Sequence, residues 1–180
     1  MSEKLDKVII ELAEYLLEEG INDGFRSLAK EKSKSISIAD LPEMKSRLYR
    51  PPKQSSKYSM RKHGLGGWIS TCQFAVFELI FNLGEEALPF IREIAWGEYD
   101  WTQGNAIELL IRLASDDIRR DEIINEIKYN YPTIREEAQL YAIQPLMKEL
   151  SRNDKLKSVF NELLTVEEFK KSYDDLNVTG

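Results

Sequence analysis

Hydrophobic residues recur at three- and four-residue steps through most of the chain, which is the spacing of amphipathic helices. The pattern predicts a first helix over residues 3–19, and Gly20 ends it. A second predicted helix starts at Asn22 or Asp23, whose side chain caps it, and continues to Lys32. These two helices are expected to cap the rest of the fold.

Residues 33–67 have a different composition, rich in Ser, Pro and Gly, and this composition predicts a long loop. One short helix is expected inside it, from Leu41 to about Leu48. Asp40 and Glu43 have the spacing of a capping box, and Pro42 suits the first turn of a helix. The rest of the segment is long enough to indicate either disorder or a functional loop.

From residue 68 to about 165 the pattern predicts helices in antiparallel pairs, followed by a C-terminal helix or tail over 166–180. In the second helices of successive pairs, Val76, Leu79, Ile80 and Leu83 match Ala106, Leu109, Leu110 and Leu113 at a shift of 30 residues, and then Ile143, Leu146, Met147 and Leu150 at a shift of 37. A repeat of this length built from two helices is typical of a helical solenoid.

The residues over 84–114 resemble a HEAT or HEAT-like (armadillo-type) repeat. The resemblance lies in the sequences LGEEALPFI, from Leu83 to Ile91, and NAIELLIRLA, from Asn105 to Ala114. It implies an all-α fold: a short right-handed α-α superhelix of about three helix pairs with an N-terminal capping helix, in one domain over 1–180. Pro145 departs from the pattern, because a proline inside a second helix is expected to kink it.

Charge is distributed unevenly along the chain. The total of 25 basic and 31 acidic residues gives a net charge of -6, which disfavours nucleic-acid binding. The strip 43–63 nevertheless carries a local charge of +6 and leaves -12 on the remainder. The acidic body favours a basic protein partner. The strip contains Arg50, Arg61 and Lys62 as candidate binding residues. It either holds phosphates or an acidic surface, or forms a solvated loop, or lies across the acidic solenoid and neutralises it.

Little in the sequence points to chemistry. The single cysteine, Cys72, lies in an apolar stretch, which predicts a buried thiol. His63 is the only histidine, so a catalytic triad or a multi-histidine metal site is not expected, and no phosphate-binding loop motif is present. We expect no catalytic residue, metal or cofactor. Because no apolar run is long enough for a membrane span and no secretory signal is recognisable, we expect a cytoplasmic protein that does not enter the membrane.

Two groups of residues are candidate binding sites. In HEAT-like stacks the second helices line an inner surface, and the shift of 30 places Glu78 level with Glu108 and Asn82 level with Arg112, with Asn105 beside them. The alternative is a solvated face with a Glu108–Arg112 pair, worth about 0.3–0.5 kcal/mol. The second group is the expected turn from Trp96 to Trp101.

This turn, WGEYDW, contains three large aromatic residues, Trp96, Tyr99 and Trp101. Such side chains combine a large apolar area with a polar tip and often anchor protein partners. In the alternative interpretation, Trp96 and Trp101 close the ends of their helices against the core, and only Tyr99 is exposed.

These observations favour a non-catalytic protein-binding module, in particular an acidic protein of the immunity or inhibitor type that binds a basic protein. An alternative from the enzyme class is a HEAT-like protein that acts on DNA bases. Such proteins use Trp, Asp and Arg, which Trp101, Asp100 and Arg112 would supply here with the help of the basic strip. The net negative charge argues against this alternative. A third alternative is a domain that only self-associates.

Overall fold

The computed structural model describes residues 2–178, and within them all regular secondary structure is helical, with eleven α-helices and no strand. This confirms the predicted all-α class. The chain divides into two compact units, Met1–Ala87 and Leu88–Gly180, and each is described by itself. The prediction of one domain over the whole chain stays a prediction.

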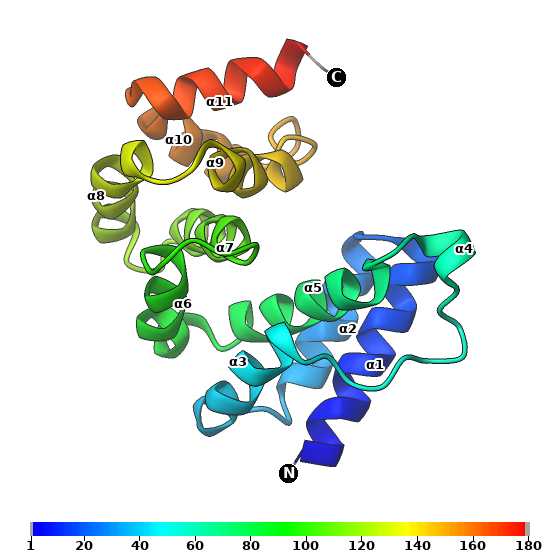
Figure 1. The fold of residues 1–180 in the computed structure, drawn as a ribbon. Coiled ribbons are helices and arrows are strands. Elements are labelled where there is room, and N and C mark those ends of the chain that lie inside the picture. The colour runs from blue at the N-terminus through cyan, green and yellow to red at the C-terminus, as the bar shows by residue number, and fades with distance from the viewer. Residues whose placement is uncertain (1, 179–180) are drawn as a thin grey trace. The chain divides into compact units, whose positions relative to one another are not determined.

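The first unit is built around α5 (Gly67–Phe81). The helices α1 (Ser2–Glu19), α2 (Asp23–Ser33), α3 (Leu41–Tyr49) and the short α4 (Met60–His63) all pack against it (Figure 1). Neighbours on several sides explain why α5 carries few polar residues, because a helix that is apolar on all faces needs cover on all of them. Cys72, Val76, Leu79 and Ile80 of α5 are fully buried.

The predicted N-terminal helices are present with nearly the expected bounds. Gly20 follows α1 with a φ of +70°, the left-handed conformation in which glycine ends helices. Asn22 caps α2, and its Oδ1 accepts a hydrogen bond of 2.9 Å from the backbone N–H of Phe25.

The helix predicted from Leu41 is also present as α3, but the predicted capping box is wrong. Asp40 does not pair with Glu43. A 3-10 turn, Ile38–Asp40, precedes α3, and the Asp40 carboxylate accepts hydrogen bonds from the backbone N–H of Ser37 at 2.9 Å and from its hydroxyl at 3.1 Å. Asp40 therefore closes the turn in front of the helix instead of capping the helix itself.

The segment between α3 and α5 is fastened to the first unit at several points. The indole Nε1 of Trp68 donates to the carbonyl of Pro52 at 2.8 Å. The hydroxyl of Ser55 donates to Glu14 on α1. Residues 50–66 are thus held by contacts with α1 and α5, and a functional role for this segment stays a prediction.

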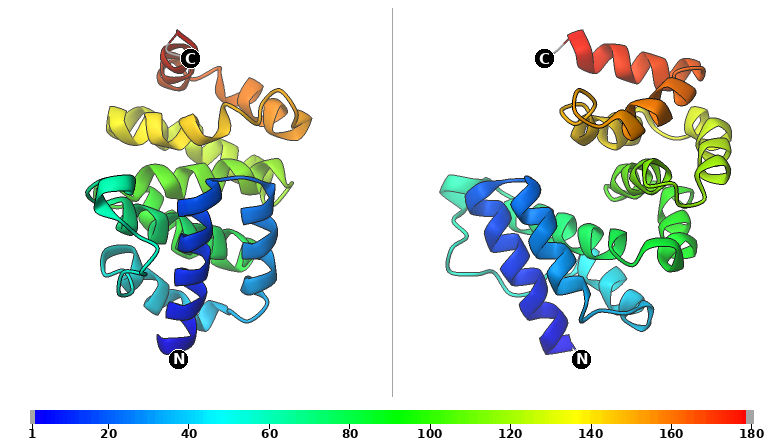
Figure 2. Two further views of the ribbon diagram at one scale, coloured as in Figure 1. Left: turned by 90° about the vertical axis from the view of Figure 1, so that its right-hand side faces the viewer. Right: turned by 180° about the vertical axis from the view of Figure 1, so that it is seen from behind.

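The second unit consists of α6 (Leu88–Ala95), α7 (Gln103–Ser115), α8 (Arg120–Asn130), α9 (Glu136–Ile143), α10 (Asp154–Leu163) and α11 (Glu167–Val178). The helix α7 is central and packs against α6, α8, α9 and α10, while α11 packs on α9. Figure 2 shows α7, α9 and α11 in successive layers.

A glycine allows α7 and α9 to approach closely. A Cβ atom added to Gly104 would lie 2.6 Å from the Cβ of Tyr141 and 2.9 Å from the carbonyl oxygen of Ala138. Both atoms belong to α9, so any side chain at position 104 would push the two helices apart. The close approach fixes the start of α7 against the middle of α9.

The second helix that was expected to contain Pro145 and continue to Leu150 is present only as far as Ile143. The helix α9 ends at Ile143, and Pro145 lies in the 3-10 turn Gln144–Leu146 that follows. Proline lacks the N–H that would continue the helix and disfavours a helical conformation in the residue before it. The apolar match at a shift of 37 residues therefore falls largely outside a helix, and Ala138, Ala142 and Ile143 supply the buried face of α9.

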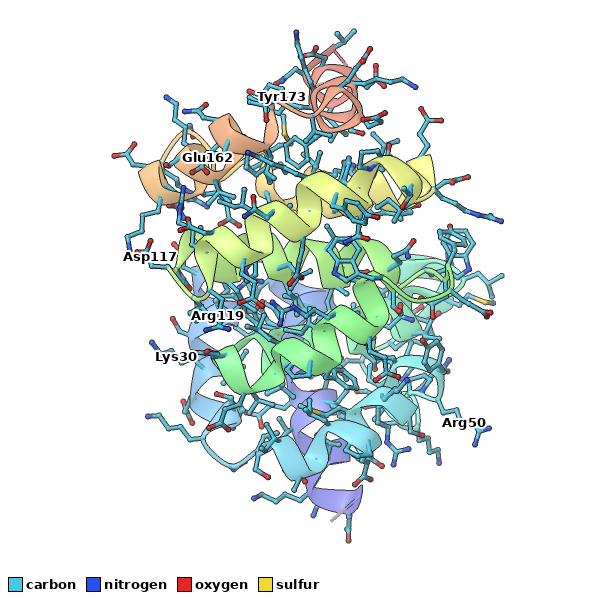
Figure 3. All side chains as sticks on the ribbon, turned by 90° about the vertical axis from the view of Figure 1, so that its left-hand side faces the viewer. Lys30, Arg50, Asp117, Arg119, Glu162 and Tyr173 are labelled. Carbon is cyan, nitrogen blue, oxygen red and sulfur yellow. The ribbon has the colours of Figure 1, made fainter. Side chains whose placement is uncertain are left out.

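The turn between α7 and α8 contains two left-handed residues other than glycine. Asp117 has a φ of +63° and Arg119 a φ of +46°, and α8 begins at Arg120. Figure 3 labels both residues on this turn. The carboxylate of Asp117 accepts a hydrogen bond of 2.5 Å from the Lys155 ammonium of α10, which fastens the turn to that helix.

Ion pairs connect alternate helices of the second unit. Arg92 of α6 lies 2.7 Å from a carboxylate oxygen of Glu126 on α8, and Arg120 of α8 lies 2.6 Å from one of Glu162 on α10. Figure 3 labels Glu162 on its helix. Lys171 of α11 pairs in the same way with Glu136 of α9 at 2.9 Å. Each pair joins a helix to the one two places further along the chain.

Within residues 2–178, no helix combines the length and the apolar character that crossing a bilayer requires.

Candidate binding pocket

The turn between α6 and α7 forms one wall of a pocket in the second unit. The pocket has a volume of about 210 Å³, and the segment that joins α8 to α9 forms its other wall. Its lining residues are Trp96, Gly97, Tyr99, Gln103, Asn130, Thr133, Ile134 and Arg135. Two of the aromatic residues that the sequence singled out therefore line the pocket, together with five residues outside the turn that it did not.

Gln103 at the start of α7 is held in a fixed orientation. Its side chain is almost fully buried, with the residue 3% exposed, and its Nε2 donates to the carbonyls of Ala95 at 3.1 Å and Gly97 at 3.3 Å. These bonds occupy the amino end of the amide. The Oε1 at the other end is buried and has no hydrogen-bond partner among the described residues.

Trp96 supplies a second buried polar atom without a partner. Its indole Nε1, a donor only, is shielded from solvent and makes no hydrogen bond within the described part of the chain. The indole of Trp68 differs in this respect, because it donates to Pro52. Trp96 and Gln103 both line the pocket, and the unsatisfied donor of one and acceptor of the other are enclosed by the surrounding residues.

Tyr99 and Arg135 lie together at the pocket. The guanidinium carbon of Arg135 is 4.4 Å from the centroid of the Tyr99 ring, in cation–π geometry. Tyr99 also contacts Trp101, with the ring centroids 6.5 Å apart. Trp101 is 70% exposed, so the interpretation in which it closes a helix against the core is wrong, and Tyr99 is half-buried.

Two local features shape the turn. The carboxylate of Asp100 accepts hydrogen bonds from the backbone N–H of Thr102 at 2.7 Å and from its hydroxyl at 2.5 Å, which directs the chain into α7. A Cβ atom on Gly97 would lie 2.5 Å from the carbonyl oxygen of Glu93, so the turn requires glycine there. Both features fix how the aromatic residues are presented.

The predicted inner-face residues are largely buried. Glu108 and Arg112 form the expected pair on α7, with Nη1 and Oε1 3.4 Å apart, but both side chains are at least nine-tenths buried. Asn105 on the same helix is half-buried. The description of these residues as a solvated face is therefore wrong.

Glu78 and Asn82 belong to the first unit, on α5 and directly after it. Glu78 is buried, and the Asn82 side chain donates to the carbonyl of Glu78 at 2.7 Å, which closes the end of the helix. The role of these two residues in a shared ladder stays a prediction.

The three residues of the enzyme alternative have separate environments. The Asp100 carboxylate accepts a hydrogen bond from Thr102, Trp101 is exposed, and Arg112 forms an ion pair with Glu108. Trp101 precedes α7, whereas Arg112 lies about 14 Å along its axis at the usual rise per residue. No observation in the structure favours that alternative.

The basic strip of the first unit is partly neutralised by α1. Arg47 binds the Asp6 carboxylate with two nitrogens, at 2.5 and 3.3 Å, and Lys57 lies 3.0 Å from Glu18 and 3.5 Å from Glu14. The hydrogen bond to Glu18 raises the pKa of Lys57. These two cations are thus neutralised by α1, and the alternative in which the strip lies across the acidic solenoid stays a prediction.

The remaining candidate residues of the strip are accessible. Arg50, Arg61 and Lys62 are exposed, and Figure 3 shows the Arg50 side chain at the edge of the first unit. They lie in the first unit and do not contribute to the pocket.

The net charge is carried by the second unit. Residues 1–87 contain thirteen basic and thirteen acidic residues, whereas residues 88–180 contain twelve basic and eighteen acidic ones. The net charge of -6 therefore belongs to the part of the chain that contains the pocket.

Five pocket residues were missed by sequence reasoning: Gln103, Asn130, Thr133, Ile134 and Arg135. Four of them lie in the segment around Tyr131, which the sequence marks only as a break between helices. Their one local signal is the proline of the sequence YPTIR, which predicts a turn but not what the turn faces.

The described residues contain no cluster of three or more His, Cys, Asp or Glu side chains that are placed to hold a metal ion. Cys72 is buried as predicted, and its burial raises the pKa of its thiol to about 12.

Comparison of the chain with protein-family models, with curated proteins and with solved structures finds no significant match.

Proposed function

We propose that the chain is a non-catalytic protein-binding module of the inhibitor or immunity type, and that it binds a basic protein partner through the turn Trp96–Trp101. The observation that supports this most directly is the exposure of Trp101. Its large ring stands in solvent beside Tyr99 and Arg135, at a pocket whose buried walls carry unsatisfied polar atoms.

The residue types at this site are those that dominate protein interfaces. Trp, Tyr and Arg are enriched among the few residues that carry most of the binding energy. Covering the exposed part of the Trp101 ring would remove enough apolar surface from water to contribute about 3 kcal/mol. The surrounding Tyr99 and Arg135 would exclude water from the contact.

The charge of the second unit favours a basic partner. Eighteen acidic residues against twelve basic ones give this unit a negative field that extends about 10 Å at moderate salt. The same field repels nucleic acid, so binding to DNA or RNA at this unit is disfavoured. We expect association with the partner to slow as salt is raised.

We further propose that residues 88–178 form a HEAT-like right-handed stack of helix pairs. Three observations support it: α7, α9 and α11 lie in successive layers, Arg92 joins α6 to α8, and Arg120 joins α8 to α10. The first helices of the pairs, α6, α8 and α10, thus neighbour one another, and so do the second helices, α7, α9 and α11. Stacked helix pairs require this arrangement.

The single buried thiol of Cys72 suits a reducing compartment, and on this ground we propose a cytoplasmic location.

The proposal is tested by affinity capture from an extract of the source organism, followed by measurement of the affinity for the captured protein. The wild type and the Leu65→Ala variant, which truncates an exposed apolar residue of the first unit, should retain one basic protein equally. Trp101→Ala should weaken binding at least fivefold, since it removes more than about 1 kcal/mol.

Equal retention by Trp101→Ala and the wild type would place the interface elsewhere. Retention of the same chain instead of a second protein would support self-association, which sedimentation of the purified chain would show directly. An acidic captured protein, or binding that is insensitive to salt, would contradict the electrostatic part of the proposal.

A further inference from the structure

We propose that the corner between α4 and α5 docks the first unit on an anionic phospholipid bilayer, with the Leu65 side chain in the interface and Arg61 and Lys62 against the lipid headgroups. The proposal concerns a second surface and does not depend on the partner-binding turn of the second unit. It is carried by the exposure, the charge and the fixed conformation of one short segment, residues 58–67.

The corner exposes two large apolar side chains. Leu65 is 92% exposed, more than any other large hydrophobic residue within 2–178, and Met60 at the start of α4 is 60% exposed. Figure 1 shows α4 at an edge of the first unit, beside the start of α5. One exposed hydrophobic residue is ordinary on a protein surface. Two in the same corner, on either side of two cations, indicate a docking surface.

The charges in this corner have one sign. Arg61 and Lys62 are exposed and form no ion pair within the part of the chain that the structure describes. The sequence has no acidic residue between positions 43 and 78. Lys57 lies 3.0 and 3.5 Å from two carboxylates of α1 and neutralises them. The corner therefore offers two unpaired positive charges beside its apolar side chains, which complements an anionic surface.

The backbone on both sides of Leu65 is fixed. Leu65 lies between Gly64 and Gly66, whose φ values of +80° and +86° are left-handed and turn the chain at this point. The hydroxyl of Tyr58 donates to the carbonyl of Gly64 at 2.8 Å, and the Tyr58 ring contacts that of the buried Trp68, with the centroids 6.1 Å apart. Because the corner is preformed, docking costs little ordering of the chain.

A bilayer surface suits this corner better than an acidic protein. A stable protein interface covers about 800 Å² on each partner, which one short turn does not supply. In the bilayer interface a leucine side chain is surrounded by acyl chains without a complementary pocket, and cations gain from the anionic headgroups. Residues 1–87 contain as many basic as acidic residues, so the first unit as a whole is not repelled. The cytoplasmic leaflet carries the anionic lipids, in agreement with the location proposed above.

The test is co-sedimentation of the full chain with vesicles of phosphatidylcholine, with and without about 30% phosphatidylserine. The chain should bind the anionic vesicles at least tenfold more strongly. Leu65→Ala should weaken this binding at least fivefold, because it removes apolar groups that the interface buries, and Leu65→Phe should retain it. Ile38→Ala is the matched control, since it truncates another exposed apolar residue of the first unit, in the turn before α3, and should have no effect.

Two variants of equal net charge test the electrostatic part. Each cation near an anionic bilayer strengthens binding about fivefold, so replacing Arg61 and Lys62 together by Gln should weaken it at least tenfold. Replacing Lys30 and Lys34 by Gln removes two exposed cations at and beyond the end of α2 and should weaken binding less than about twofold. Unchanged circular dichroism and thermal midpoints would show that all variants are folded.

Three results would overturn the proposal: no binding to the anionic vesicles, equal binding by Leu65→Ala and the wild type, or equal losses in the two double variants. Binding of polyglutamate without binding of vesicles would also overturn it and would assign the corner to an acidic protein. Leu65→Ala should still capture the basic partner with wild-type affinity. The bilayer proposal and the partner proposal therefore succeed or fail independently.

Discussion

The double ion pair between Arg47 of α3 and Asp6 of α1 should stabilise the first unit measurably, although most surface ion pairs do not. The two residues are 41 positions apart in the chain, so their contact joins two helices and the strap that follows α3. We predict that Arg47→Met and Asp6→Asn each lower the free energy of unfolding, and that the double variant loses less than the sum of the two.

The size of the effect follows from geometry and exposure. The guanidinium makes two charge-assisted contacts, and the side chains of Arg47 and Asp6 are 19% and 28% exposed. Such hydrogen bonds contribute about 1.5–3 kcal/mol each when buried, and partial exposure reduces their combined value to a coupling energy of about 1–2 kcal/mol. The Lys7–Glu3 pair on α1, with side chains 75% and 89% exposed, should contribute about 0.3 kcal/mol or less.

The assay is urea unfolding of the wild type, the two single variants and the double variant, followed by circular dichroism. With a slope of about 2 kcal/mol/M, the coupling energy corresponds to a midpoint difference of about 0.5–1 M. The same cycle on Lys7 and Glu3 is the matched control. A coupling energy for Arg47 and Asp6 no larger than that of the exposed pair would refute the argument from geometry and burial.

Three further predictions concern other parts of the chain. Because burial raises the pKa of the Cys72 thiol to about 12, the native protein should resist alkylation at pH 8 and react once unfolded in urea, which mass spectrometry would show; labelling at equal rates contradicts the burial. The hydrogen bond from Lys155 lowers the pKa of Asp117 below its ordinary value of 3.8, so the ionised carboxylate stabilises the native state above that value and the contribution is lost as pH falls through the lower native pKa. Lys155→Met should move the Asp117 midpoint, observed by carbon NMR, upward, and an unmoved midpoint would show that the contact does not form in solution. Finally, Gly97→Ala should destabilise the turn by about 1–3 kcal/mol, since its Cβ would meet the Glu93 carbonyl at 2.5 Å; an unchanged thermal midpoint and Trp96 resonance would contradict this.

Local signals in the sequence were sufficient for most helix boundaries. The cap at Asn22, the left-handed Gly20 and the first-turn Pro42 all act through neighbouring atoms. Gly20 correctly predicts where a helix ends, and Asn22 and Pro42 correctly predict where helices begin. The same locality explains the error after Ile143, where apolar periodicity continued past a proline that ends the helix. At that point backbone geometry outweighs the hydrophobic pattern.

The pocket could not be predicted in the same way because its walls come from distant segments. The unusual aromatic content of the turn pointed to Trp96 and Tyr99. No local sequence signal shows that Arg135 lies over the Tyr99 ring or that Gln103 directs its amide toward Ala95 and Gly97. These relations depend on how α8 and α9 pack against α7. Burial of Glu108 and Arg112 was missed for the same reason, since charge alone suggested exposure.

The confinement of the net charge to residues 88–180 has a consequence for encounter kinetics. A cationic protein that diffuses toward this chain experiences attraction to one half and none, on average, to the other. The approaching molecule is thereby turned before it touches, and collisions concentrate on the half that displays Trp101. Such steering raises the fraction of productive collisions without any additional contact in the final complex.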